Sequence, residues 1–268
     1  MLRIRRFLLF SFVCAASAAL LFDCAGKSGP ALFAAKFGES YYPSHLVNTT
    51  STREYVKLDW LFYVIEVSGK IVLVDAGMKD ESVADRFRIR GFRTAPQILK
   101  LQGIFPSQVT DIVLTHAHPD HVGGITFFPN AVVHVQDAEF QAIRYAPKLA
   151  PVKKIFEEIL TSGHLRVHSG DTDLYGVKIL LAGGHTPGSQ AAVVQTSNRA
   201  FIITGDECYF ADACVAQIPL PEESAFSPEK NQKFIQRVGS QNWRILTLHD
   251  PAVFSAYDAR LRIVRLTQ

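Results

Sequence analysis

The sequence predicts an α/β fold in which two β-sheets pack face to face and helices cover their outer sides. Short apolar, β-branched segments alternate with segments of helical length from about residue 60 onward. Several of the apolar segments run directly into a histidine or an aspartate. Strands that end on functional groups are typical of a site built at the edge of a rigid sheet. This order of elements favours a layered sandwich.

The first residues read as a secretory leader over residues 1–24, ahead of the folded body. Arg3, Arg5 and Arg6 precede an apolar stretch over residues 7–22, which is too short for a comfortable membrane span. We therefore expect an exported protein, either periplasmic or secreted. A buried N-terminal helix or an uncleaved anchor is the alternative.

The end of the leader has two interpretations. Small residues over 16–18 suit cleavage, whereas Cys24 permits a lipoprotein leader, although Asp23 fits poorly before a lipidated cysteine. Attachment to a membrane is expected only if Cys24 is lipidated. Residues 25–268 then form one folded domain, because 48% of the 268 residues are hydrophobic and no linker-like stretch divides them.

The strands are expected in the following order. Leu61–Val67 and Ile71–Asp75 form a hairpin around Ser68-Gly69-Lys70. Four later strands each lead to a polar residue: Ile112–Leu114 to His116, Val177–Ala182 to His185, Phe201–Thr204 to Asp206, and Ile245–Leu248 to His249.

The helices are expected between and after these strands. Pro96, Pro151 and Pro228 mark helix starts, where the missing amide hydrogen costs least. The six predicted helices are Asp80–Arg90, Pro96–Gln102, Asp137–Tyr145, Pro151–Leu160, Pro228–Val238 and Ala252–Val264. Arg260, Arg262 and Arg265 would form the polar face of the last one.

The charge of the body excludes one class of partner. Removing residues 1–24 takes three arginines and one aspartate from 28 basic and 25 acidic residues, which leaves 25 and 24. Such a near-neutral body has no electrostatic footprint for nucleic acid. We expect a small-molecule substrate, and the sequence does not give the oligomeric state.

Residues 116–121, His-Ala-His-Pro-Asp-His, indicate a metal site. Three imidazoles and a carboxylate within six residues exceed what an ordinary loop uses. His116 and His118 can converge on one ion, while Asp120 and His121 turn toward a second. These ligands suit zinc, and also iron, manganese or cobalt, with zinc as the default.

The motifs resemble those of the metallo-β-lactamase superfamily. The cluster at 116–121 is similar to the family's second motif. Residues 72–77 (VLVDAG), 184–188 (GHTPG), 204–206 (TGD) and 248–249 (LH) are similar to the first, third, fourth and last motifs. The resemblance implies a four-layer αββα sandwich with the site at the edge of the two sheets.

The resemblance also implies seven ligands for two divalent ions. His116, His118 and His185 would hold the first ion, Asp120, His121 and His249 the second, and Asp206 would bridge them. Two ions about 3.5–4 Å apart can share a water and lower its pKa toward neutrality. The expected reaction is therefore hydrolysis through a metal-bridging hydroxide.

Two residues narrow the kind of hydrolase. The true β-lactamases typically lack a bridging carboxylate such as Asp206. Tyr209 lies three residues after Asp206, the offset found in the N-acyl homoserine lactonases, the quorum-quenching group, where the hydroxyl stabilises an oxyanion. We expect a lactonase in which Asp120 also acts as general acid. The alternative for Tyr209 is an aromatic core residue.

Other residues receive structural interpretations. Asp75 is expected to orient a ligand histidine. His45, His134, His164 and His168 have no motif context, and Cys208 is not expected to bind metal. The aromatic residues near the first strands are expected in the core, with an acyl-chain groove as the alternative: Phe33, Phe37, Tyr41, Tyr42, Trp60 and Phe62. Cys208 and Cys214 could form a disulfide or remain thiols.

Two other functions stay open. A thioester hydrolase of the glyoxalase II type uses the same ligands, but recognises glutathione through basic residues near its C-terminus, and an exported location argues against it. A metal-binding scaffold without turnover is the other alternative. Degenerate members normally lose ligands, and this chain retains all seven.

Overall fold

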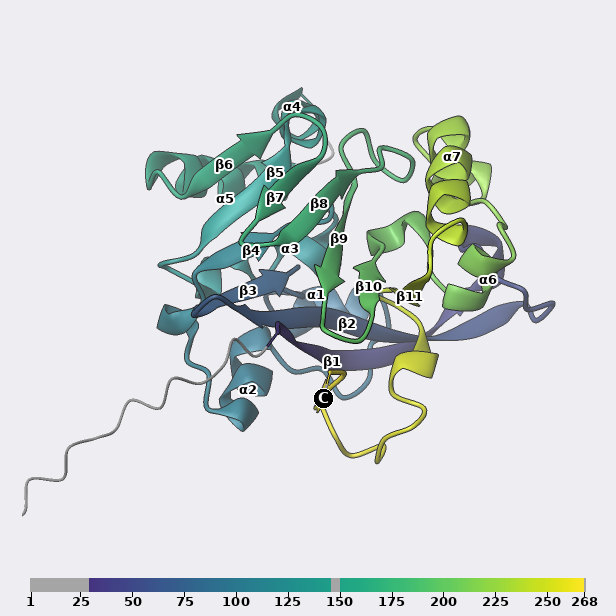
Figure 1. Cartoon of the computed structure of the whole chain (residues 1–268), viewed down its shortest axis with the longest axis horizontal. Coiled ribbons are helices and arrows are strands. Elements are labelled where there is room, and N and C mark those ends of the chain that lie inside the picture. Colours follow the sequence, from purple (N-terminus) through teal and green to yellow (C-terminus); the bar gives the residue numbers. More distant parts are fainter. Residues whose placement is uncertain (1–28, 146–149, 268) are drawn as a thin grey trace, which may run out of the picture.

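The computed structural model describes residues 29–145 and 150–267, and shows two β-sheets packed face to face with helices on both outer sides (Figure 1). The seven-stranded sheet has the order β12-β1-β2-β3-β4-β5-β6, and the five-stranded sheet has the order β11-β10-β9-β8-β7. The predicted four-layer sandwich is confirmed. The proposed leader lies outside the described residues.

The strands include all those predicted. In the larger sheet they are β1 (Ala31–Pro43), β2 (Tyr55–Val67), β3 (Lys70–Val74), β4 (Asp111–Val113), β5 (Val132–Gln136), β6 (Leu165–His168) and β12 (Ile263–Arg265). In the smaller sheet they are β7 (Thr172–Leu174), β8 (Val177–Leu181), β9 (Gln190–Gln195), β10 (Ala200–Ile203) and β11 (Trp243–Leu246).

The helices follow the predicted order up to residue 239. They are α1 (Glu81–Arg86), α2 (Ala95–Leu99), α3 (Pro119–Val122), α4 (Asp137–Tyr145), α5 (Ala150–Thr161), α6 (Ala211–Val215) and α7 (Pro228–Gly239). Short 3-10 turns extend α2 and flank several loops. No helix within residues 29–145 and 150–267 is long and apolar enough to cross a membrane.

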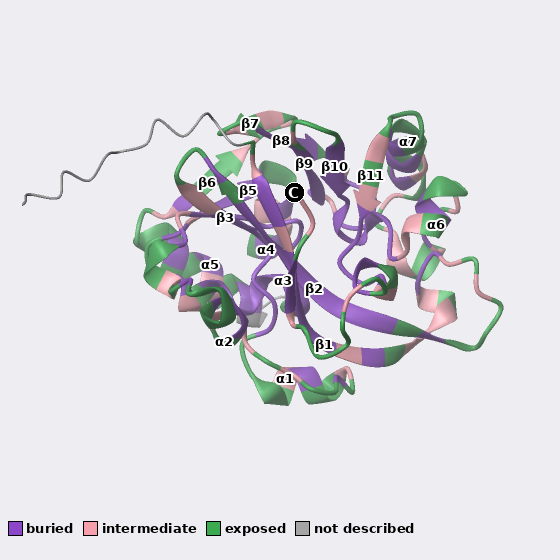
Figure 2. Cartoon of the chain, turned by 60° about the horizontal axis from the view of Figure 1, so that its bottom comes forward, coloured by how far each residue is buried: buried purple, intermediate pink, exposed green. Residues whose placement is uncertain are grey.

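Three hydrophobic clusters fill the three spaces between the four layers. Along β2, Leu61, Tyr63 and Ile65 face the second sheet, whereas Phe62 and Val64 face the helices that cover the first. This alternation follows from the two-residue period of a strand. Both faces of the central strands are buried, while the helices expose their outer sides (Figure 2).

The predicted C-terminal helix Ala252–Val264 is wrong. The chain forms one 3-10 turn, Pro251–Val253, and then crosses to β12, which pairs antiparallel with β1. Pairing satisfies backbone groups at the edge of β1 that would otherwise be exposed. Arg260, Arg262 and Arg265 therefore do not share a helix face.

The predicted helix Asp80–Arg90 is correct only in its first half. Asp80 caps α1 by accepting a hydrogen bond from the Val83 amide. The helix ends at Arg86, Arg88 adopts a φ of 53°, and Arg90 pairs with Glu39 of β1. Pairing with the sheet thus replaces the last turn of the helix.

Gly124 is the point where the loop after α3 touches the loop after β3. Its amide donates to the Gly77 carbonyl at 2.9 Å, and the Ala76 amide donates to the His121 carbonyl at the same distance. A Cβ on Gly124 would lie 2.1 Å from the Ala76 carbonyl oxygen. Only glycine permits this approach.

We predict that Gly124→Ala lowers the free energy of unfolding by about 1–3 kcal/mol, because two backbone segments must separate. Gly239→Ala at the end of α7 is the control, since its Cβ would meet only the side chain of Gln217, at 3.5 Å or more. Urea unfolding of the two variants measures the difference. Equal midpoints would show that the contact is not constrained.

Candidate metal centre

The candidate metal ligands all lie at one edge of the sandwich, where strands from both sheets end. His116 follows β4, His185 follows β8, Asp206 follows β10 and His249 follows β11. β10 and β11 are parallel to each other, and β8 runs in the same direction because β9 is antiparallel to both β8 and β10. The sheet topology thus brings four distant segments of the chain together.

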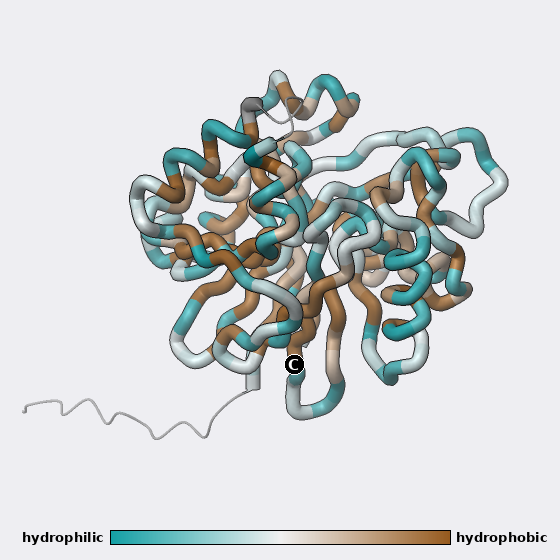
Figure 3. Tube along the Cα trace, turned by 90° about the horizontal axis from the view of Figure 1, so that it is seen from above, coloured by the Kyte–Doolittle hydropathy of each residue, from teal (hydrophilic) through white to brown (hydrophobic). Residues whose placement is uncertain are grey.

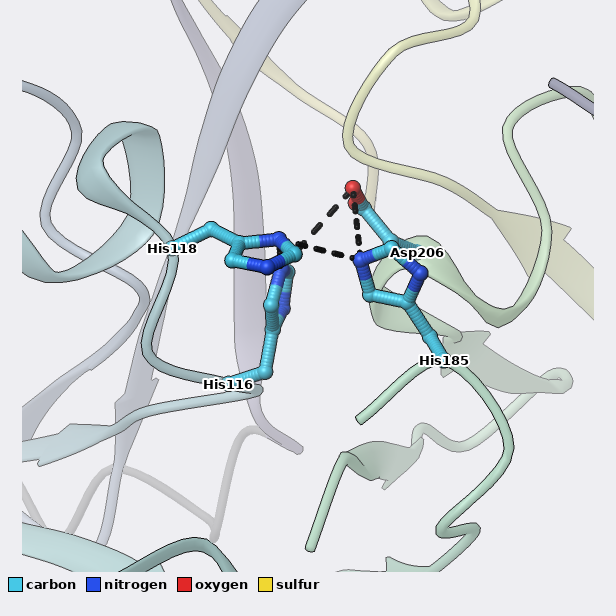
Figure 4. Close-up of side chains that lie close together, drawn as sticks. All are labelled: His116, His118, His185 and Asp206. Atoms are coloured by element: carbon cyan, nitrogen blue, oxygen red, sulfur yellow. Dashed lines mark hydrogen bonds and ion pairs between the residues drawn. The ribbon is translucent and has the colours of Figure 1, made fainter. Parts of the chain in front are cut away.

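The first cluster consists of His116, His118 and His185 with Asp206 (Figure 4). The Nδ1 of His118 lies 2.9 Å from the Nε2 of His116 and 3.1 Å from the Nε2 of His185. The Oδ2 of Asp206 lies 3.9 Å from the Nε2 of His116 and 3.7 Å from that of His185. Three imidazole nitrogens and one carboxylate oxygen therefore converge on one point.

The second cluster consists of Asp120, His121 and His249, again with Asp206. Asp120 and His121 lie on the short helix α3, which Pro119 begins. The Nε2 of His121 lies 2.9 Å from Asp120 Oδ2 and 3.5 Å from Asp206 Oδ1. The Nε2 of His249 lies 3.2 Å from Asp206 Oδ1. The two oxygens of Asp206 thus face different clusters.

Asp75 holds the second cluster from behind. One of its oxygens accepts from the Thr115 amide, and the other lies 2.7 Å from both the Thr115 hydroxyl and the Nδ1 of His121. Asp75 is fully buried and has a φ of 63°, an uncommon conformation that aspartate tolerates better than most residues. Because His121 Nδ1 donates to Asp75, its Nε2 is left to face the site, as expected from the sequence.

Glu139, at the start of α4, joins the two loops of the first cluster, and sequence reasoning missed it. Its carboxylate accepts from the Ala117 amide, between His116 and His118, and from the Thr186 hydroxyl and the Gly188 amide in the loop of His185. It is 3% exposed. No motif spacing marked this residue, because helix packing brings it to the site.

Glu207 holds the loop of His185 and was also missed. Its Oε1 accepts from the amides of Gly184 and His185 at 3.0 and 2.8 Å, and its Oε2 accepts from the Asn231 side chain at 2.7 Å. A Cβ on Gly184 would lie 2.3 Å from Glu207 Oε2, so only glycine fits there. His185 Nδ1 lies 2.7 Å from the Ser224 carbonyl, which leaves its Nε2 for the cluster.

Several polar atoms of the site are buried without a hydrogen-bond partner in the described part of the chain. They are His121 Nε2, Asp206 Oδ1 and both ring nitrogens of His249. A buried polar atom without a partner is costly and needs an explanation. Divalent cations would satisfy these atoms, and the imidazole and carboxylate donors suit them. The residues present therefore fit two metal ions.

His116 and His118 both have lowered pKa values, which keep their imidazole rings neutral. Burial, followed by the neighbouring His121 and His118, lowers the pKa of His116 well below 6.5. Burial, followed by His185, lowers the pKa of His118 to about 4. Neutral imidazole is the form that binds metal, so few protons compete with a cation here near neutral pH.

The second cluster favours charged side chains, unlike the neutral histidines of the first cluster. Burial alone would lower the pKa of His121, but the carboxylates of Asp120, Asp206 and Asp75 outweigh burial and raise it well above 6.5. Burial likewise opposes ionisation of Asp206, yet His249 and His121 outweigh it and lower the pKa of Asp206 well below 3.8. This concentration of negative charge attracts a cation, which would replace the His121 proton.

Tyr209 lies over the site and opens onto its cavity. Its ring stacks on His249, with centroids 5.1 Å apart, and meets His185 edge-on at 6.3 Å. Its amide donates to Asn48 Oδ1, and its carbonyl accepts from the Thr247 hydroxyl. Burial, followed by Asp206 and Asp120, raises its pKa well above 10, so the hydroxyl remains a donor.

A cavity of about 680 Å³ leads to the clusters. Its floor includes His118, Asp120, Asp206 and His249. Its walls include Leu46, Leu58, Trp60, Phe87, Tyr209 and Phe226. Glu139 and Glu223 are also in the lining, whereas no lysine or arginine of residues 29–145 or 150–267 is.

The aromatic residues near the first strands divide between core and cavity. Phe37 and Phe62 are buried in the core, as expected, and Tyr41 is 65% exposed. Tyr42 and Trp60 line the cavity. Their position agrees better with the alternative expectation, an acyl-chain groove, than with a place in the core alone.

Within the described residues, the other histidines and cysteines are not members of the two clusters. His134 bonds to Asp111 and stacks on His168. Cys208 forms a disulfide with Cys214, so its sulfur is not available to a metal.

Comparison with known proteins agrees with this geometry. The sequence profile of the Metallo-beta-lactamase superfamily matches residues 61–210. An N-acyl homoserine lactonase of Bacillus cereus is 26% identical over 228 residues, covering 79% of this chain and 86% of the relative.

Two solved structures show the same fold. A quorum-quenching N-acyl homoserine lactone lactonase, 24% identical, superimposes with a TM-score of 0.74 over 88% of this chain and 99% of its own. The dizinc quorum-quenching lactonase AidC, 18% identical, superimposes with a TM-score of 0.64 over 91% and 96%. With its motifs, its two sheets and more than half of its length matched, this chain belongs to the metallo-β-lactamase superfamily.

Proposed function

We propose that this protein is a dinuclear metal-dependent hydrolase that opens the ring of N-acyl homoserine lactones. The observation that carries the proposal is the placement of Asp206, whose two oxygens face two separate histidine clusters. The lactonases among its relatives and the dizinc structure of AidC support it.

The two clusters of side chains support a division of the seven proposed ligands between two ions. His116, His118 and His185 would hold one ion, and Asp120, His121 and His249 the other, with Asp206 between them. Two divalent ions, zinc in our proposal, would supply a water of lowered pKa and would polarise the carbonyl of the substrate.

The cavity favours a neutral substrate with an apolar tail. A lactone ring at the floor would lie against Asp120 and Tyr209, while an acyl chain could follow the wall of Leu58, Phe87 and Phe226. Most of a small ligand's surface contacts apolar lining in such pockets, and a few polar groups orient it. The large and hydrophobic walls match that division.

Two side chains would act on the reacting atoms. Tyr209 retains its proton, so its hydroxyl can donate to the oxygen on which negative charge develops. Asp120 is ionised, because His121 lowers its pKa against the effect of burial. Its carboxylate can accept a proton from the attacking water and then deliver it to the leaving alkoxide.

The cavity is unsuitable for a glutathione thioester, the substrate of the alternative function. Glutathione carries two carboxylates, which would face Glu139 and Glu223 with no basic residue in the described lining. The arginines that could have recognised it do not form the predicted helix. Arg260 pairs instead with Asp258 at the surface.

A substrate panel tests the proposed function. Zinc-loaded protein is expected to hydrolyse N-acyl homoserine lactones faster than a glutathione thioester, a cephalosporin or a phosphodiester. Initial rates at equal substrate concentration give the comparison, and chelator-treated protein is the control. Preference for any non-lactone substrate would contradict the proposal, and absence of all turnover at full metal loading would favour a scaffold.

Tyr209→Phe is expected to lower kcat for lactones by about 10²–10³-fold, the effect of removing one oxyanion donor. Metal content should not change, because the ring that stacks on His249 is kept. Steady-state kinetics and metal analysis of the two proteins make the test, with Tyr41→Phe as the exposed control. Equal kcat values would remove Tyr209 from the chemistry.

A further inference from the structure

A second polar hollow lies where the described chain begins. Its volume is about 310 Å³, and Arg199, Arg244 and Arg265 line it beside Gly29 and Pro30. A neighbouring hollow shares Gly29, Pro30 and Arg265 and adds Lys70. We call Lys70, Arg199, Arg244 and Arg265 the basic face.

The basic face has an excess of positive charge. Glu66 is the carboxylate in the lining of the two hollows. Within residues 29–145 and 150–267, the three arginines form no ion pair, whereas Arg237 and Arg260 do. Arg244 and Arg265 instead lie over the rings of Phe201 and Phe33, at 5.9 and 5.8 Å. Their charges are therefore open to an anion from solution.

The basic face lies at the opposite end of the strands from the metal centre. Arg199 precedes β10 and Arg244 is near the start of β11, whereas Asp206 and His249 follow the ends of the same strands. Seven residues from Arg199 to Asp206 span about 20 Å if extended. Pairing of Phe33 with Arg265 places the start of the described chain beside the C-terminal strand (Figure 3).

We propose that the basic face binds the phosphate headgroups of an anionic phospholipid membrane. The four cations belong to separate elements and border one end of the sandwich, so a surface that carries many phosphates can reach all of them. Cys24 supports this occupant, because its lipidation would hold the body to a membrane by the end at which the basic face lies. Cys24 lies five residues before Gly29, a distance of at most about 17 Å.

This orientation would leave the cavity open to water. The metal centre lies at the far end of the sandwich, so a body that rests on its basic face would admit substrate from the side away from the lipid. The inference does not depend on which ester the enzyme hydrolyses. Its failure would leave the proposed function untouched.

The test compares three forms of the full chain: wild type, Arg199→Gln/Arg244→Gln/Arg265→Gln, and the control Lys100→Gln/Lys153→Gln/Lys154→Gln. The control removes the same charge from exposed residues that do not line either hollow. Sedimentation with vesicles of phosphatidylcholine, with and without phosphatidylglycerol, gives the preference for anionic lipid. Any binding by the leader is common to all three forms.

In the arginine variant, the affinity for phosphatidylglycerol vesicles relative to phosphatidylcholine vesicles is expected to fall by about tenfold or more. Each basic residue near an anionic surface contributes about fivefold to the affinity. The control should keep most of it, and high salt should remove it from the wild type. Unchanged preference in the arginine variant, or equal loss in the control, would overturn the proposal. So would displacement from vesicles by millimolar inorganic phosphate, which would indicate a site for free phosphate.

If the triple arginine variant does not fold, as judged by circular dichroism, Arg199→Gln and Arg244→Gln are tested separately by the same sedimentation. Each is expected to weaken the preference for anionic vesicles by about fivefold, and an unchanged preference in both would contradict the proposal.

Discussion

Asp206 is the constraint on which the arrangement of the site depends. It follows β10 of the smaller sheet and is 3% exposed. One of its oxygens faces His116 and His185, and the other faces His121 and His249. A carboxylate can occupy such a position only if groups of opposite charge surround it, because an uncompensated buried charge is strongly unfavourable. The histidines meet that condition in part, and bound cations would complete it.

A second set of buried carboxylates keeps the histidines in place. Asp75, Glu139 and Glu207 each accept hydrogen bonds from backbone amides or side chains of the loops that carry the ligands. These acceptors satisfy loop amides that would otherwise be buried without partners. Asp75 also selects which ring nitrogen of His121 faces the site. The site is thus positioned by packing of the two sheets and by carboxylates that are not themselves members of the two clusters.

Much of the architecture could be predicted from the sequence, because strand ends, turn residues and metal-ligand spacing are local signals. The hairpin at Ser68-Gly69, helix α4 and the seven clustered residues are examples. The C-terminal helix was wrong, because pairing of Ile263–Arg265 with β1 decides that segment and pairing is not local. Glu139 and Glu207 were missed for the same reason, since their roles arise from contacts between distant segments. The ligand roles and the leader remain predictions.

A crystal structure of the zinc-loaded protein, with anomalous data collected at the zinc edge, would show whether Asp206 bridges two ions. We expect two peaks about 3.5–4 Å apart, with one oxygen of Asp206 bound to each. A single peak in either cluster, or two peaks with Asp206 bound to only one, would contradict the bridging role and the dinuclear centre built on it.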